Sequence, residues 1–193
     1  DLRKPANYAL AVDRVRYVGQ PVAAIIAETI DQARDAAEAV KLEIDILDAV
    51  DNVEAAARDD APQIWPEASG NLCLDFENGD QAAVEAAFAN AAHISRLRIV
   101  NNRVVIAPIE PRAALADYDG RFTLYIGCQS PYASKNMLAK HVLNVPPGEV
   151  RIVTKNVGGS FGMKSPVYPE YVVILHAARE SGRPVKWCDQ RTD

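Results

Sequence analysis

The sequence predicts a mixed α/β (α+β) fold, and three patterns in its 193 residues indicate this class. An apolar run, a helical repeat and an alternating run follow one another between residues 22 and 47. Farther along, two alternating runs flank Asp119-Gly120, the dipeptide most typical of a tight β-hairpin. A helical repeat and a short apolar strand then occupy residues 169–188. Strands and helices therefore follow one another along most of the chain.

A strand, a helix and a second strand are predicted first. Val22–Ala27 is a short apolar run typical of a buried strand. Thr29 and Gln32 have the spacing of a capping box, and the alanines behind them recur at helical spacing. Lys41–Leu47 alternates apolar with charged residues, as a half-buried strand does. Because one such unit makes a thin core, we expect it to be part of a larger domain.

The middle of the chain is less regular. Prolines and glycines punctuate residues 48–79, which predicts a connection that runs over the surface. Asp80 stands where a residue could cap a helix that reaches Ala92, and we predict a strand at Ile94–Val100.

The second half carries the stronger signals. The hairpin strands are expected at Ala113–Tyr118 and Arg121–Gly127. Ser130-Pro131 is typical of a helix start, and this helix should end at Asn144 because Pro146-Pro147 cannot continue it.

A glycine-rich loop, Val157–Lys164, follows a predicted strand at Val150–Thr154. The next helix, from Pro169 to Ser181, has one apolar face, formed by Tyr171, Ile174, Leu175 and Ala178. Gly182 should end this helix, and Val185–Cys188 is predicted to be the last strand.

The composition argues against several classes of protein. The net charge is −5 and there is no basic stripe, which disfavours nucleic acid as a partner. No apolar run approaches the roughly 20 residues that a membrane helix needs. The histidines lie far apart and suggest no metal site. The cysteines are few and odd in number, which favours a reducing, cytoplasmic compartment and three buried side chains, at Cys73, Cys128 and Cys188.

The main functional candidate is the loop Gly158-Gly159-Ser160-Phe161-Gly162-Met163-Lys164. Glycines between a strand and a helix let backbone N–H groups approach an anion closely. A phosphate-binding P-loop needs Gly and Lys adjacent, but Met163 separates Gly162 from Lys164. A dinucleotide fingerprint ending on Gly162 would need glycine where Val157 stands. The loop is therefore either a ligand contact or a tight turn with positive φ, and the turn is the more frequent case.

Several segments together resemble the large, molybdopterin-binding subunit of the molybdenum hydroxylases, the family of aerobic CO dehydrogenase, aldehyde oxidase and xanthine dehydrogenase. The glycine-rich loop, followed by Tyr168-Pro169-Glu170, resembles the signature loop of that family. Four more segments resemble family segments in the expected order: Tyr17–Ala23, Ile109–Arg112, Gly127–Pro131 and Arg183–Trp187. The resemblance implies part of a hammerhead-type α/β domain over residues 1–60. A connecting segment over 61–92 and the first part of a molybdopterin-binding domain over 93–193 would follow.

The resemblance also implies a cofactor-binding site. Gln129 would hydrogen-bond an oxo ligand of the molybdenum or the nearby cofactor. Four loop residues would lie against the pterin: Gly158, Gly159, Phe161 and Gly162. Without the resemblance, Gln129 is more simply a solvated residue at a helix start, and Phe161 a core residue. Ser160 replaces the commonest glycine of the signature, a variation that the loop should tolerate.

Other residues in the same segments are expected to be structural. We expect Glu110 and Arg112 to form an ion pair that braces the domain, and Lys164 and Glu170 to have structural roles. Ser165 stands where purine hydroxylases of this family carry a glutamate, which disfavours xanthine as the substrate.

For the whole protein, the resemblance implies oxidation or hydroxylation of a small substrate, with water as the oxygen donor. Molybdenum–molybdopterin would be the cofactor, and iron–sulfur and flavin subunits or domains the partners; a homodimer of complexes is also compatible. The general base is expected downstream of residue 193, so we expect no catalytic residue in this fragment and no activity from it alone. The alternative is a non-catalytic cofactor-binding or interaction module that has retained the fold.

Overall fold

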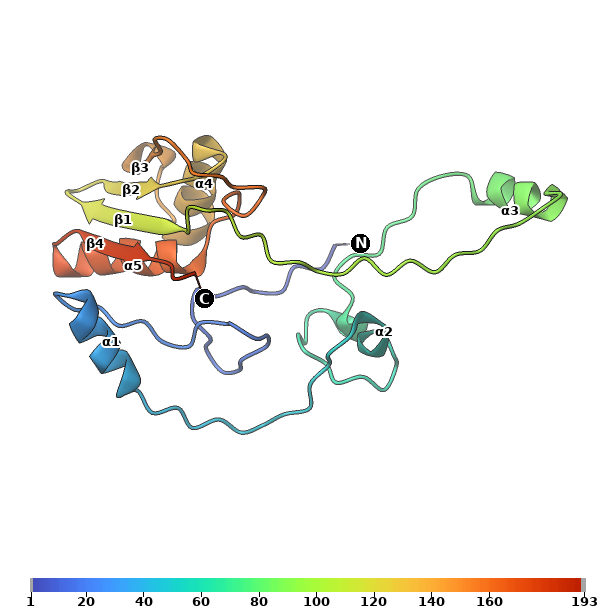
Figure 1. The fold of residues 1–193 in the computed structure, drawn as a ribbon, viewed down its shortest axis with the longest axis horizontal. Helices are drawn as coiled ribbons and strands as arrows, with labels where there is room; N and C mark the ends of the chain where they lie inside the picture. Colours follow the sequence, from blue (N-terminus) through green and yellow to red (C-terminus); the bar gives the residue numbers. More distant parts are fainter. Residues whose placement is uncertain (1, 192–193) are drawn as a thin grey trace. The chain divides into compact units, whose positions relative to one another are not determined.

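The structure, a computed structural model, describes residues 2–191 and divides into two compact units. The residues up to Ala6 and Asp45–Val104 form the first unit, while Asn7–Ile44 and the residues from Val105 onward form the second. The second unit contains a four-stranded sheet with both parallel and antiparallel pairs, together with helices (Figure 1). The predicted mixed α/β class is therefore confirmed.

The first unit is mostly irregular and is held by short elements. These are α2 (Val53–Ala56), the 3-10 turn η1 (Ser69–Asn71) and α3 (Gln81–Asn90). The Asn71 side chain joins the loops, because its Nδ2 donates to the carbonyl oxygens of Ala56 and Pro62, both at 3.0 Å. Asp80 caps α3 as predicted and accepts a hydrogen bond from the Ala83 N–H at 2.9 Å.

The sheet of the second unit has the strand order β3-β2-β1-β4. Its strands are β1 (Ala113–Tyr118), β2 (Phe122–Ile126), β3 (Val150–Val153) and β4 (Val185–Cys188). Strand β1 pairs antiparallel with β2 across the predicted hairpin, where Gly120 has a φ of 95°. It also pairs antiparallel with β4, whereas β2 and β3 run parallel. All four strands predicted in this half of the chain are confirmed.

The helices of this unit begin and end near the predicted residues. Helix α4 (Pro131–Met137) continues into the π-helical turn η2 (Leu138–Leu143), and the chain leaves it at Asn144, whose φ is 53°. A 3-10 turn, η3 (Pro147–Glu149), precedes β3. Helix α5 (Pro169–Ser181) ends at Gly182 in the left-handed region, as a helix C-terminus favours. Helix α1 (Ile30–Glu38) starts with the predicted capping box of Thr29 and Gln32.

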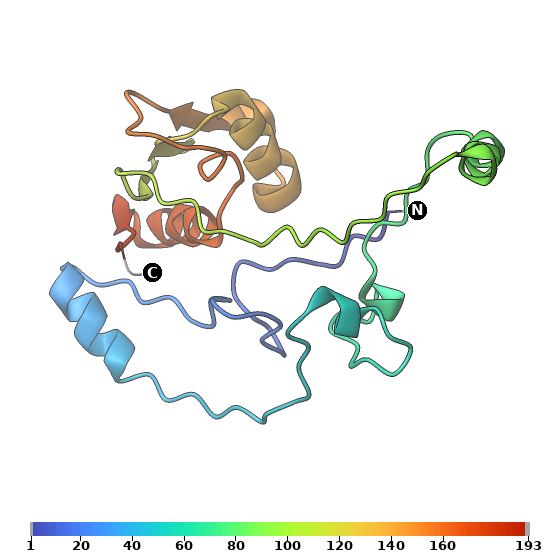
Figure 2. The ribbon, with the colours of Figure 1, turned by 45° about the vertical axis from the view of Figure 1, so that its right-hand side comes forward.

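The core lies on one face of the sheet, where α5 and α4–η2 pack (Figure 2). The predicted apolar face of α5 is confirmed, since Tyr171, Ile174, Leu175 and Ala178 are each at most 3% exposed. The opposite face, which we call the open face, carries one row of residues across the four strands. In strand order these are Val153, Tyr125, Leu115 and Lys186. Leu115 and Tyr125 remain 36% and 40% exposed there.

Three predicted strands are wrong: Val22–Ala27, Lys41–Leu47 and Ile94–Val100 form no strand. Within residues 2–191 these segments have no ladder partner, and a strand needs a neighbour to satisfy its backbone N–H and C=O groups. Their apolar side chains are correspondingly exposed; Ile46, for example, is 96% exposed. Periodicity indicated which residues could pair, but it could not supply the pairing strand.

The prediction of three buried cysteines is correct for Cys128 and wrong for Cys73 and Cys188. Cys188 follows Lys186 by two residues in β4, so strand alternation places it on the open face. Cys73 lies in the irregular first unit. A cysteine side chain is small, so burying it gains little free energy. Its hydrophobicity alone therefore does not predict whether it is buried or exposed.

Candidate functional site

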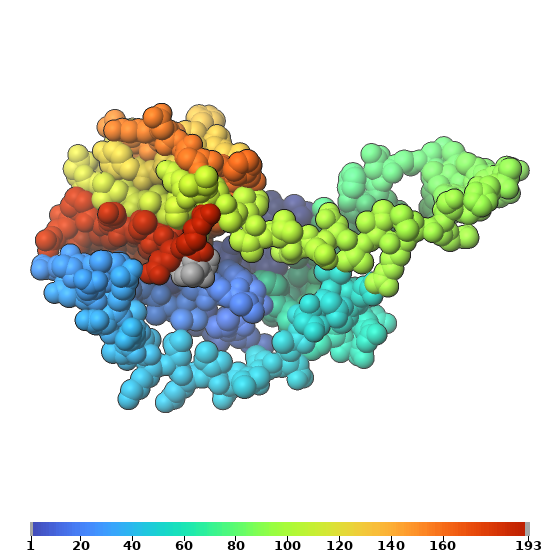
Figure 3. Space-filling view, viewed as in Figure 1, coloured from blue at the N-terminus to red at the C-terminus, as the bar shows by residue number. Residues whose placement is uncertain are grey.

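Two segments that are distant in the sequence meet at the carboxyl ends of β2 and β3. Gln129 follows β2, and the glycine-rich loop follows β3. The two strands are parallel neighbours, with Tyr125 opposite Val153, so both chains leave the sheet at the same edge. The carboxyl ends of parallel strands are a common place for ligand sites. The loop lies at the surface of the unit, next to the sheet (Figure 3).

Direct hydrogen bonds join Gln129 to the loop. The Ser160 hydroxyl donates to Gln129 Oε1 at 2.8 Å, and the Gln129 backbone N–H donates to the Lys164 carbonyl oxygen at 3.1 Å. The Lys164 N–H in turn donates to Ser160 Oγ at 2.9 Å. Gln129 and the loop, which the resemblance assigns to one site, are therefore in direct contact.

The loop turns through residues with positive φ. Gly159 and Gly162 both have φ values of 94°, a region that glycine adopts at little cost. Phe161 lies between them with a φ of 53°, and its side chain is 79% exposed. The hypothesis that Phe161 is a core residue is therefore wrong. Its exposed ring instead lies beside Gly159, with Cε2 only 3.1 Å from where a Cβ atom of that residue would be.

Gly158 is required by the protein itself. A Cβ atom at this position would lie only 2.6 Å from Glu110 Cβ. The backbones pair at this point, because the Glu110 N–H donates to the Gly158 carbonyl oxygen at 3.3 Å. The Gly158 N–H also donates to Glu110 Oε2 at 2.7 Å. Close approach of one backbone to another thus explains this glycine without a ligand.

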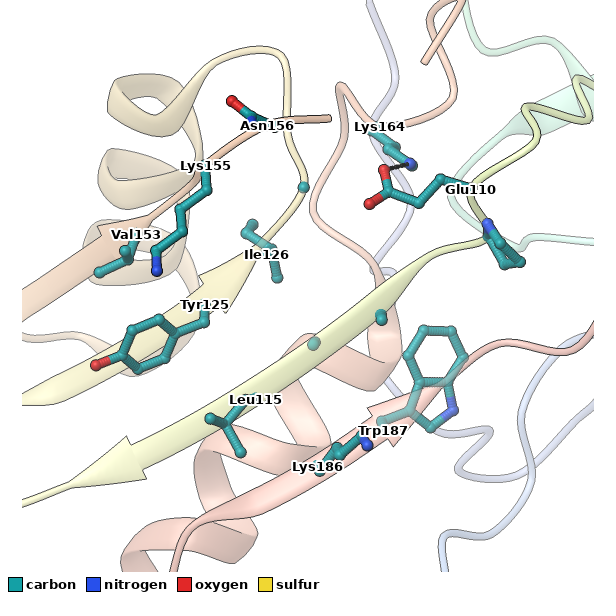
Figure 4. Close-up of a pocket in the computed structure, with 14 residues that line it drawn as sticks. Glu110, Leu115, Tyr125, Ile126, Val153, Lys155, Asn156, Lys164, Lys186 and Trp187 are labelled. Atoms are coloured by element: carbon teal, nitrogen blue, oxygen red, sulfur yellow. Dashed lines mark hydrogen bonds and ion pairs between the residues drawn. The ribbon is translucent and has the colours of Figure 1, made fainter. Parts of the chain in front are cut away.

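An ion pair between the buried Lys164 and the partly exposed Glu110 holds the loop in place. The Lys164 side chain is 1% exposed, and its Nζ lies 2.5 Å from Glu110 Oε2 (Figure 4). The hydrogen bonds from Lys164 and then from the Gly158 N–H lower the pKa of Glu110, and burial opposes them. Both donors favour the carboxylate, so Glu110 is held in its charged form. Glu110 is therefore ion-paired as expected, but its partner is Lys164 and not Arg112.

Arg112 braces the other side of this region. Its guanidinium pairs with Glu170 and with Asp189, the latter at 3.1 Å, and stacks 3.9 Å from the centre of the Tyr168 ring. Burial raises the pKa of Glu170, while Arg112 opposes that shift. Arg112 thus ties α5 to the end of β4, as expected for an ion pair that braces the domain.

A pocket of about 430 Å³ lies on the open face. Tyr125, Leu115 and Lys186 project into it from neighbouring strands, and Glu110 and Lys164 form its end nearest the loop (Figure 4). Neither Gln129 nor any residue of 158–162 lines it. The pocket is therefore next to the predicted site and is not the site itself.

Residues 2–191 contain neither a metal-ligand cluster nor a helix that could span a membrane. This part of the chain has no group of three or more His, Cys, Asp or Glu side chains arranged to hold a metal ion. None of its helices is both long and apolar enough to cross a bilayer.

Sequence reasoning missed two residues. Ser160 was expected to be a neutral replacement, yet its hydroxyl connects Gln129 to the loop. The only signal was a hydroxyl side chain within a run of glycines. Asp189, the second partner of Arg112, was not considered, and a separation of 77 residues gives no local signal.

The chain matches two known families along its length. Residues 64–193 match a family described as the molybdopterin cofactor-binding domain. Residues 2–48 match one described as the aldehyde oxidase and xanthine dehydrogenase a/b hammerhead domain.

Individual proteins are similar over nearly the whole chain. The subunit gamma of the 6-hydroxypseudooxynicotine dehydrogenase complex of Paenarthrobacter nicotinovorans is 38% identical over 95% of this chain and 23% of that protein. The carbon monoxide dehydrogenase large chain of Hydrogenophaga pseudoflava is 34% identical over 95% of this chain and 25% of its own length. The solved structure of reconstituted CO dehydrogenase from Oligotropha carboxidovorans has a TM-score of 0.86 at 26% identity, covering 94% of this chain and 24% of that one. The chain thus spans about a quarter of the length of the relatives it matches.

Proposed function

The chain belongs to the large, molybdopterin-binding subunits of the molybdenum hydroxylases, and we propose that Gln129 and the glycine-rich loop form one wall of the cofactor site. The observation that carries this proposal is the hydrogen bond between Ser160 Oγ and Gln129 Oε1, which brings both predicted segments to one edge of the sheet. Gln129, Gly158, Gly159, Phe161 and Gly162 are the proposed cofactor-binding residues.

The residues present fit a pterin-bound metal. Gln129 offers an exposed amide, and Gly162 has no side chain to keep a planar ring system away from the loop backbone. The exposed Phe161 ring provides an apolar surface beside them. A metal held through pterin sulfur atoms needs orientation from the protein more than it needs side-chain ligands.

Each residue then has a defined task in the site. When bound, the molybdenum–molybdopterin group supplies the two-electron acceptor for oxidation of a substrate carbon. Gln129 would donate a hydrogen bond to an oxygen of that group, and the exposed Phe161 ring would shield the group from water. The Lys164–Glu110 pair holds the loop in position without touching the ligand. Gly158 allows the loop to approach Glu110.

For the whole protein, we propose oxidation or hydroxylation of a small substrate with water as the oxygen donor. The relatives named above include subunits of multi-subunit complexes, which supports iron–sulfur and flavin subunits or domains as partners. The matches at 2–48 and 64–193 support a hammerhead part followed by a molybdopterin-binding part, and the second match already includes residues 64–92 of the expected connection. Exposed free thiols at Cys73 and Cys188 support a cytoplasmic location.

The test is a Gln129→Ala variant of the full-length protein. We expect the molybdenum content or the turnover to fall about tenfold, as for loss of one hydrogen bond to a ligand. The free energy of unfolding should change by less than about 0.5 kcal/mol, because Gln129 is exposed. Gln81→Ala, at an exposed glutamine of α3, is the matched control and should change neither.

Equal loss of function and stability in Gln129→Ala would contradict the proposal and favour a structural role. Wild-type function in that variant would instead favour the alternative of an interaction module that has retained the fold.

A further inference from the structure

Ser160 takes part in two hydrogen bonds, and chemistry fixes the direction of the one that it receives from the Lys164 backbone. A serine hydroxyl has one proton to donate and two lone pairs that can accept. Its Oγ accepts from the Lys164 backbone N–H at 2.9 Å, and that N–H can only donate. The hydroxyl proton is therefore available for the other neighbour, Gln129 Oε1, at 2.8 Å.

This arrangement orients the Gln129 amide. If the amide were reversed, its Nε2 would donate to Ser160 Oγ, and the serine proton would lose this acceptor. The backbone of Gln129 is fixed as well, because its N–H donates to the Lys164 carbonyl oxygen at 3.1 Å. With Oε1 bound to Ser160, the NH₂ group has to point away from the loop. No described residue accepts a hydrogen bond from it.

We propose that Ser160 is a positioning residue that turns Gln129 into an outward-facing hydrogen-bond donor. The site then selects, at this point, an acceptor oxygen of oxo, carbonyl or carboxylate type and disfavours a donor. The inference rests on the proposed function, in which the Gln129 amide faces the cofactor. It adds a defined polarity to that contact and gives a role to the one hydroxyl residue of the loop.

Variants of the full-length protein can test this polarity. Ser160→Ala removes the hydroxyl, and Ser160→Thr keeps it. Gln129→Glu keeps the bond from Ser160 but presents an acceptor where the NH₂ group was. The readouts are molybdenum per chain after extended dialysis, measured by elemental analysis, and kcat and KM in a dye-reduction assay with CO, an aldehyde and an N-heterocycle.

We expect Ser160→Ala to lose molybdenum or kcat about threefold to tenfold, the effect of one weakened hydrogen bond. Ser160→Thr should stay within about twofold of wild type, and Gln129→Glu should be as impaired as Gln129→Ala. Adding Ser160→Ala to Gln129→Ala should cause no further loss, because the two residues act through one contact.

Three outcomes would overturn the inference. In the first, Ser160→Ala keeps the molybdenum content and kcat of the wild type while Gln129→Ala loses them. Gln129 would then bind the cofactor without help from the serine. In the second, the losses in the double variant are additive. In the third, Gln129→Glu functions like wild type, and this result remains informative even if Ser160→Ala fails to fold. If Gln129→Ala kept the molybdenum content and turnover of the wild type, the proposed function itself would be contradicted. This outcome is distinct from the other three.

Discussion

Lys164 and Glu110, 54 residues apart in the sequence, form an ion pair of 2.5 Å in which the lysine side chain is almost completely buried and the carboxylate is not. The Glu110 side chain is 43% exposed and also receives the Gly158 N–H. The pair therefore connects the glycine-rich loop to the segment that enters β1. Without its partner, the buried Lys164 would be a charge shielded from water, whereas the Glu110 carboxylate would still be partly hydrated.

Removal of the carboxylate charge should cost more stability than removal of the lysine. Glu110→Gln leaves the Lys164 ammonium buried without a counter-charge, which we expect to lower the free energy of unfolding by about 3 kcal/mol. Lys164→Met leaves a carboxylate that water and the Gly158 N–H can still solvate, and should cost less than about 2 kcal/mol. Urea unfolding of both variants at pH 7 measures the difference. A larger loss in Lys164→Met would mean that the lysine is paired elsewhere.

The same carboxylate should make stability depend on acid pH. The pKa of Glu110 is lowered below its ordinary value of 4.5 in the folded protein. The unfolded chain therefore binds this proton first, and the contribution of Glu110 is complete above pH 4.5 and lost as pH falls through the lowered value. The gap in unfolding free energy between wild type and Glu110→Gln should shrink over that range. A gap that stays constant down to pH 3 would contradict the lowered pKa.

The loop glycines should differ in their tolerance of alanine. Gly158→Ala would force a methyl group to within 2.6 Å of Glu110 Cβ, and should destabilise by about 1–3 kcal/mol and move the loop. Gly162→Ala has room but a φ of 94°, so about 1 kcal/mol is expected. Gly148→Ala is the control, because it has neither a close neighbour nor a positive φ. Thermal unfolding of the three variants gives the order of their stabilities. If Gly158→Ala were as stable as Gly148→Ala, the close approach of Gly158 to Glu110 would be refuted.

The 193-residue chain alone should not retain the cofactor. It spans about a quarter of the length of its relatives, so Gln129 and the loop supply one wall of a site that needs others to enclose a ligand. We expect elemental analysis to find far less than one molybdenum per chain. Dye-reduction assays with CO, aldehydes and N-heterocycles should show no turnover. One molybdenum per chain would mean that this one wall of the site is enough to retain the cofactor.

The fold of the second unit could be predicted where local chemistry decides it. The Asp119-Gly120 turn and the proline that starts α5 act over a few residues, so the sequence is enough. The segments Val22–Ala27 and Lys41–Leu47 carry equally clear periodicity but form no strand, because pairing depends on a neighbour that no local pattern supplies.

The site was predictable only in part, for the same reason. The glycines marked a loop with unusual backbone angles, and the resemblance linked that loop to Gln129. The partners of Glu110 and Arg112 lie 54 and 58 or more residues away, so sequence could suggest ion pairing but not with whom. The role of Ser160 depends on which proton is free to donate, and this follows only from the hydrogen bonds on both sides of it.

The register between the parallel strands β2 and β3 also determines whether Gln129 and Ser160 meet. Gln129 leaves one strand and Ser160 follows the other, so a slip of a single residue between them would separate the two side chains by roughly 3.3 Å along the strand. The same slip would turn Tyr125 into the core and Leu124 out of it, because side chains alternate between faces. An error of register that disables the site would therefore unfold the sheet as well. Molecules that are well folded but wrongly registered should therefore not accumulate.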